Sequence, residues 1–155
     1  MLQRNLSEDN IYNIALSFRS AIIAARLNDE FSSKDRMWNF PRGCCDDSCD
    51  LLAYYFYDKY KIYTEQGNGV YRDNNPYNTT NHSWLIMGSD LFIDITGDQF
   101  KVCAGFVEEV YVGKENLFYK RLEDRRIYEN YNIIEDERLW NDYLIITSHM
   151  PDEIL

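Results

Sequence analysis

The chain has 155 residues, a length typical of one domain that buries a sizeable core without disulfide support. Aromatic residues make up 15% of the sequence, which argues against a disordered chain. The formal net charge is -10, and so acidic a surface repels phosphate backbones, so nucleic acid is excluded as an expected partner.

The first predicted element is a helix from Ser7 to about Asn28. Its apolar residues recur at helical spacing and form one face: Ile11, Ile14, Ala15, Phe18 and Ile22. Ser7 precedes this face and is a suitable N-cap residue. Residues 29–43 follow as a predicted loop that ends with turn-forming residues at 41–43.

A second helix is predicted from about Cys44 to Tyr60. One of its faces is an apolar stripe that includes Cys45, Cys49, Leu52 and Phe56. The tyrosines of this helix are expected to pack against the core, because the acidic charge argues against a role in stacking on bases.

The sequence changes character after Lys61. Residues 67–81 are rich in Gly, Asn and Pro and are expected to be mostly loop, with one short strand near Val70. The apolar runs 82–87 and 91–96 are β-prone, and the Gly-Ser-Asp stretch between them predicts a hairpin.

The C-terminal part adds at least two features. Residues 108–113 are expected to form a third strand, whereas the charged segment 115–132 predicts no definite element. The apolar spacing within 135–148 predicts a final helix. We therefore expect a single α+β domain spanning 1–155, with N-terminal helices packed on a small antiparallel sheet.

The N-terminal stretch MLQRNLSEDN is polar, so we expect no signal peptide. No apolar run approaches the length of a membrane span, and no membrane partner is expected. The expected location is the cytoplasm, where thiols are kept reduced.

Three of the four cysteines cluster in FPRGCCDDSCDLLAYYF, residues 40–56. Such a cluster can be a metal site, a disulfide, buried packing or one nucleophile with neighbours. A bridge between the adjacent Cys44 and Cys45 would be strained. No C-x2-C pair is present, so we expect neither a metal nor another cofactor. The side chains available as zinc ligands would be Cys44, Cys45, Cys49, Cys103 and His82.

Cys45, His82 and Asp94 form a second pattern, in chain order. Cys45 lies at a helix start, His82 opens a β-prone run, and Asp94 lies in the next one. A histidine that takes the thiol proton, beside a helix N-terminus, makes a cysteine a good nucleophile. A carboxylate behind the histidine fixes its tautomer and orientation. If the two β-prone runs pair, His82 and Asp94 can share one face of the sheet.

Several assignments stay open at this stage. Cys44 and then Cys49 are the alternative nucleophiles, and Asp98 is the alternative carboxylate. Asn39 is a candidate oxyanion donor. Gln99 is expected to be a structural hydrogen-bonding residue at the sheet edge and His149 a surface residue. The negative charges at 46 and 47 should disfavour a thiolate unless they point away or the imidazolium outweighs them.

Residues 40–100 resemble the papain-like thiol hydrolase superfamily, and most closely its transglutaminase-like branch. The resemblance rests on Gly-Cys-Cys opening an apolar helix, then His-Ser-Trp-Leu, then Phe-Ile-Asp-Ile-Thr-Gly-Asp-Gln-Phe. It implies Cys45 as the nucleophile, His82 as general base and then acid, and Asp94 as the orienting carboxylate. Trp84 would be an aromatic residue of the cleft or the core. Many members have Trp after the cysteine, where this chain has Asp46.

The resulting expectation is a cysteine-dependent amide hydrolase, a peptidase or protein deamidase, that acts on a protein or peptide through a thioester. Two alternatives remain: a non-catalytic protein-binding module that keeps the fold, and an acyltransferase that uses the same residues.

Overall fold

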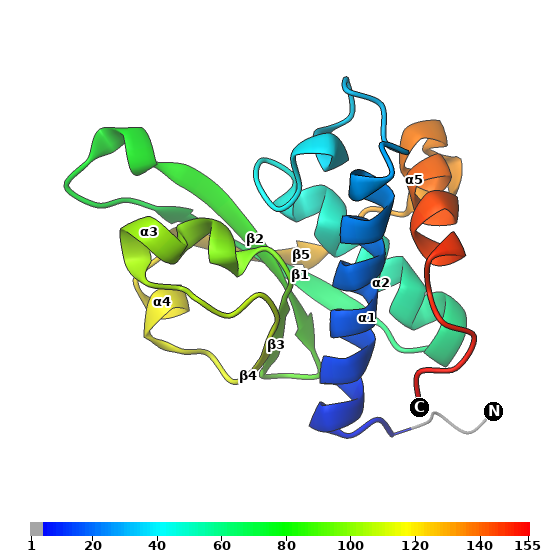
Figure 1. The fold of residues 1–155 in the computed structure, drawn as a ribbon. Helices are drawn as coiled ribbons and strands as arrows, with labels where there is room; N and C mark the ends of the chain where they lie inside the picture. Colours follow the sequence, from blue (N-terminus) through cyan, green and yellow to red (C-terminus); the bar gives the residue numbers. More distant parts are fainter. Residues whose placement is uncertain (1–4) are drawn as a thin grey trace.

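The computed structural model describes residues 5–155 and has the expected α+β architecture. Three longer helices and a five-stranded antiparallel sheet form most of it, with two one-turn helices beside the sheet (Figure 1). The helices are α1 (Glu8–Leu27), α2 (Cys45–Tyr60), α3 (Lys101–Ala104), α4 (Leu117–Lys120) and α5 (Glu137–Ser148). The strands are β1 (Thr64–Tyr71), β2 (Thr80–Met87), β3 (Leu91–Asp94), β4 (Tyr111–Gly113) and β5 (Glu123–Glu129).

Both N-terminal helices confirm the sequence prediction. The side chain of Ser7 caps α1 by accepting a hydrogen bond from the amide of Asn10 at 3.1 Å. Helix α2 ends where Lys61 adopts a left-handed conformation with φ of 55°. The predicted loop 29–43 contains one short 3-10 helix, Arg36–Asn39.

The sheet has the strand order β4-β3-β2-β1-β5. Strands β2 and β3 form the predicted hairpin, in which Leu85 lies opposite Ile93. The predicted loop 67–81 is wrong in its first part, because β1 runs through Gly67 and Gly69. These glycines leave room for the side chains of Trp84 and Leu122, which pack where a Cβ atom would be.

Each face of the sheet carries its own hydrophobic core. On one face, α1, α2 and α5 pack against Leu85, Ile93 and Ile95. On the other face, an aromatic cluster around Trp84 and Tyr119 fills the space under α3 and α4. Figure 1 shows the long helices on one side of the sheet and the two short ones on the other.

Buried Arg19 of α1 ties that helix to the end of the hairpin. Its guanidinium donates to the Ile95 carbonyl at 2.6 Å and to both carboxylate oxygens of Asp98 at 2.9 Å. Within residues 5–155, no helix combines the length and apolar character needed to cross a membrane.

Candidate active site

His82 and Asp94 lie side by side on the β2–β3 hairpin, on the face of the sheet that carries the aromatic cluster. His82 Nε2 is 2.6 Å from Asp94 Oδ2, and both side chains are fully buried. Phe100 meets the imidazole edge-on, with ring centroids 5.0 Å apart. The predicted placement of both side chains on one face therefore agrees with the structure.

Asp94 is held by donors on both carboxylate oxygens. Oδ1 accepts the backbone N–H of Thr96 at 2.9 Å, and Oδ2 accepts the hydroxyl of Tyr119 at 2.8 Å. Because these bonds favour the ionised form, they fix the carboxylate and its charge behind the histidine. Tyr119 belongs to the segment for which the sequence predicted no element, so its role could not be found there.

The two buried groups stabilise each other's charged forms. Burial by itself lowers the pKa of His82, but the Asp94 carboxylate and the Cys45 side chain raise it to about 9. Burial likewise opposes ionisation of Asp94, but His82, Thr96 and Tyr119 hold its pKa below the ordinary value. An imidazolium paired with a carboxylate is therefore the favoured state at neutral pH.

Gln99 contacts the other ring nitrogen of His82. Its Nε2 lies 3.2 Å from Nδ1, so the amide donates to Nδ1 when the imidazole is neutral. Nδ1 is also the nitrogen left to exchange a proton with a thiol, because Nε2 faces Asp94. Gln99 is thus a direct partner of the histidine, a position that its sequence context did not indicate.

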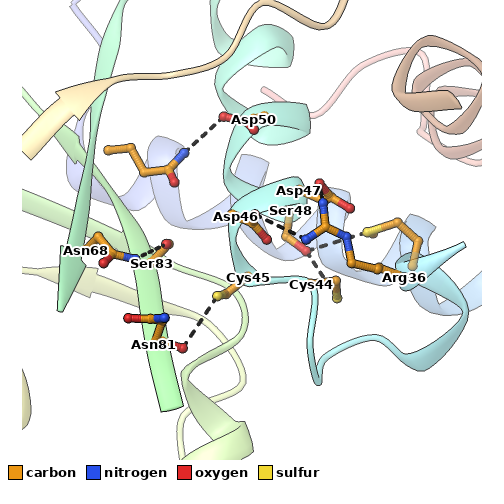
Figure 2. A network of polar contacts seen from close by, with 12 residues as sticks. Arg36, Cys44, Cys45, Asp46, Asp47, Ser48, Asp50, Asn68, Asn81 and Ser83 are labelled. Atoms are coloured by element: carbon orange, nitrogen blue, oxygen red, sulfur yellow. Dashed lines mark hydrogen bonds and ion pairs between the residues drawn. The ribbon is translucent and has the colours of Figure 1, made fainter. Parts of the chain in front are cut away.

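Cys45 is the first residue of α2 and is half-buried. Its sulfur lies 3.9 Å from the carbonyl oxygen of Asn81, the residue before His82 (Figure 2). The preceding residue, Cys44, is the N-cap but offers no side-chain cap, so the first amide N–H groups of the helix keep no intrahelical partner. Cys45 therefore combines a thiol next to His82 with unpaired backbone donors.

The acidic residues of the first turn are neutralised by arginines. Arg36 lies 3.4 Å from Asp46 and 3.0 Å from Asp47, as Figure 2 shows. Arg138 of α5 contacts the second oxygen of Asp47 at 2.9 Å. These contacts offset part of the negative charge at the helix start.

The other cysteines are free thiols, and burial opposes the ionisation of two of them. Burial raises the pKa of Cys44 to about 12, and it raises the pKa of the fully buried Cys49 well above the ordinary value. Cys103 lies on α3, with its sulfur 3.9 Å from the carbonyl of Phe100. Of Cys44, Cys45 and Cys49, only Cys45 lines the cleft described next.

Cys45 opens into a cleft of about 940 Å³. Its lining is mostly polar and comes from the start of α2 and from strands β1, β2 and β5. The residues that line it are Arg36, Gly43, Cys45, Asp46, Asn68, Val70, Thr80, Asn81, Ser83, Asp124, Arg125, Arg126 and Tyr128.

Three other candidate residues, Asn39, Trp84 and Asp98, lie where they do not contribute to the candidate triad or line the cleft. Asn39 is exposed at the end of its 3-10 helix and does not line the cleft, so an oxyanion role gains no support. Trp84 is buried in the aromatic core and belongs to the core rather than the cleft. Asp98 is engaged by Arg19 and does not replace Asp94. His149 contacts Glu30 at 2.9 Å near the C-terminus of α5.

Over the described part of the chain, no three His, Cys, Asp or Glu side chains gather in a way that could hold a metal ion. In comparisons with protein-family models, curated proteins and solved structures, nothing matched this chain. Any functional assignment therefore rests on the residues and their geometry.

Proposed function

We propose that the chain is a cysteine-dependent amide hydrolase with a papain-like, transglutaminase-like core, acting on a protein or peptide. The observation that carries the proposal is the position of His82, which faces the buried Asp94 with Nε2 and adjoins the half-buried Cys45 of the cleft. Burying a histidine with a carboxylate costs solvation energy, which a purely structural site can avoid with apolar residues.

The proposed reaction uses each of these groups once per half-reaction. At neutral pH the proton of Cys45 already lies on His82, so the sulfur attacks the amide carbonyl carbon as the thiolate. Backbone N–H groups at the start of α2 stabilise the oxyanion. His82 then gives the proton to the leaving amine, and the C–N bond breaks to leave a thioester.

Water completes the cycle. His82 takes a proton from the water molecule as its oxygen attacks the thioester carbonyl. The C–S bond then breaks, the carboxylic acid product leaves, and the thiolate of Cys45 and the protonated His82 are restored. Asp94 stays ionised throughout and keeps the imidazole in the orientation that exposes Nδ1 to the sulfur.

Alkylation by iodoacetamide between pH 5 and 9, with the labelled cysteine located by mass spectrometry, tests the proposal. We expect Cys45 to be labelled before the other thiols at pH 6, and to lose that advantage in His82→Ala. Cys44→Ala is the matched control, because it removes the neighbouring thiol and should leave the labelling of Cys45 unchanged. A Cys45 that is labelled no faster than the other thiols would favour the binding-module alternative instead.

A further inference from the structure

A row of three polar side chains crosses the floor of the cleft beside Cys45. In the sheet register, Asn68 of β1 lies opposite Ser83 of β2 on one side and opposite Arg126 of β5 on the other. Directly opposed residues share a face of the sheet. Leu85, two residues after Ser83, packs under α1 and α2, so the row lies on the face of the sheet that α2 covers. Cys45, at the start of α2, lines the same cleft as this row.

The three side chains of this row differ in which polar groups remain free to bind a ligand. Asn68 donates from Nδ2 to Ser83 Oγ at 2.9 Å, a bond that Figure 2 shows close to Cys45. This leaves the Asn68 carbonyl oxygen free to meet a substrate, whereas the Ser83 hydroxyl also hydrogen-bonds with Tyr128. Arg126 is exposed and has neither an ion-pair nor a hydrogen-bond partner among residues 5–155.

The other charged residues that line the cleft are paired. Arg36 is held by Asp46 at 3.4 Å and by Asp47. The remaining two charges, at positions 124 and 125, are held by Arg72 and Glu115 respectively. The charge that the cleft leaves uncompensated is therefore the guanidinium of Arg126, on a chain whose net charge is -10.

We propose that Arg126 makes the cleft selective for amide substrates that carry a carboxylate near the scissile bond. The inference rests on the proposed function, because only an enzyme has a substrate. The preference of the cleft for negatively charged molecules does not depend on catalysis. A planar guanidinium with five donors suits a carboxylate, and the carbonyl oxygen of Asn68 can accept a hydrogen bond from an adjoining peptide group. The carboxylate can be an acidic side chain or a chain terminus.

Three thiol-directed probes of equal size separate these cases: N-chloroacetyl-glutamine amide, N-chloroacetyl-glutamate amide and N-chloroacetyl-glutamine with a free carboxyl group. The first is neutral, the second carries a side-chain carboxylate, and the third carries a terminal one. Second-order rates of Cys45 alkylation are measured for each at pH 7 and pH 9 in low salt. We expect at least one acidic probe to react about fivefold faster than the neutral probe, and the faster one identifies the source.

Arg126→Gln should abolish this preference, Arg126→Lys should keep part of it, and 0.5 M NaCl should weaken it. Lys120→Gln, at an exposed position on α4, removes the same charge away from the cleft lining and should leave the preference intact. Equal rates for all probes, or a preference that survives Arg126→Gln or falls equally in Lys120→Gln, would overturn the inference.

The two proposals fail in different measurements. The pH profile of the neutral probe, compared with His82→Ala, reports the nucleophile, whereas the ratio of acidic to neutral rates reports the cleft. As a check that does not use the thiol, Cys45→Ala is titrated with N-acetyl-glutamate amide or with N-acetyl-glutamine that has a free carboxyl group, whichever matches the faster probe, and followed by amide NMR shifts. Shifts that depend on Arg126 support the inference, and their absence contradicts it.

Discussion

Tyr119 donates a 2.8 Å hydrogen bond to Oδ2 of Asp94, the same oxygen that lies 2.6 Å from His82 Nε2. One carboxylate oxygen thus joins the hairpin that carries the histidine to helix α4. The bond reaches across the aromatic core, and it places a residue of the C-terminal part behind the proposed catalytic pair.

Tyr119→Phe should therefore destabilise the fold by about 1–3 kcal/mol, because it removes a buried hydrogen bond to a charged group without changing the ring. It should also raise the pKa of Asp94, since a donor to the ionised form is lost. Urea unfolding at pH 7 measures the first effect. Tyr77→Phe, at a position 95% exposed, is the matched control and should unfold like the wild type. Equal stability of both variants would mean that the bond to Asp94 contributes nothing measurable.

Gln99→Ala tests the partner of the other imidazole nitrogen. The Gln99 amide, 3.2 Å from His82 Nδ1, stabilises the neutral ring, so its removal should raise the pKa of His82. The chain has only two histidines, which makes an NMR titration of the ring protons easy to assign. His149 serves as the internal control, and its titration should be the same in both proteins. A lower pKa for His82 in the variant would show that Gln99 stabilises the charged ring instead, with its carbonyl oxygen accepting from the Nδ1–H group.

Helices α1 and α2 could be predicted because apolar residues recur on one face of each at helical spacing. The β2–β3 hairpin is buried on both faces, and two apolar, β-prone runs around a Gly-Ser-Asp turn indicated it instead. The triad candidates followed because Cys45, His82 and Asp94 all lie in these elements. Strand β5 could not be found this way, because all seven of its residues are exposed and no alternation marks it.

Other features depend on tertiary contacts that leave no local signal. Gly67 and Gly69 are typical of turns, yet they lie in β1 because Trp84 and Leu122 need the space above them. The contacts of Tyr119 and Gln99 with the site join residues 25 and 17 positions away from their partners. Only the packing of the aromatic core brings them there.

The His82–Asp94 pair should make stability fall as pH rises above neutrality. The pKa of His82 is about 9 in the folded chain and about 6.5 when unfolded, so between these values the folded state binds more protons. The contribution is complete below pH 6.5 and is lost as pH passes 9, and it is on the order of 3 kcal/mol. Urea unfolding at pH 6 and 9 should show a smaller pH effect in His82→Gln than in the wild type. Identical pH dependence in the two proteins would contradict the assigned charge state.

Asp142 of α5, a second buried carboxyl group, should also make the stability of the fold decrease as pH rises. Here the cause is a group that is neutral in the folded state. Burial and a hydrogen bond to the neighbouring Asp35 carboxylate raise the pKa of Asp142 to about 9. Arg138, 3.8 Å away, lowers this pKa but does not offset the other effects. Two carboxyl groups joined by a hydrogen bond must share a proton, so Asp142 is protonated at pH 7 in the folded state and ionised in the unfolded state.

Asp142→Asn keeps a hydrogen-bond donor toward Asp35 and removes the proton uptake. Stability of the wild type should decrease between about pH 4 and 9 by up to about 1.4 kcal/mol per pH unit from this group alone, and the variant should lose that slope. The variant should therefore be the more stable protein at pH 8. Urea unfolding at pH 5, 6.5 and 8 measures both slopes, with Asp136→Asn, at the half-buried N-cap of α5, as the matched control. If the Asp142 variant keeps the wild-type slope, Asp142 is ionised in the folded chain and Arg138 alone compensates its charge.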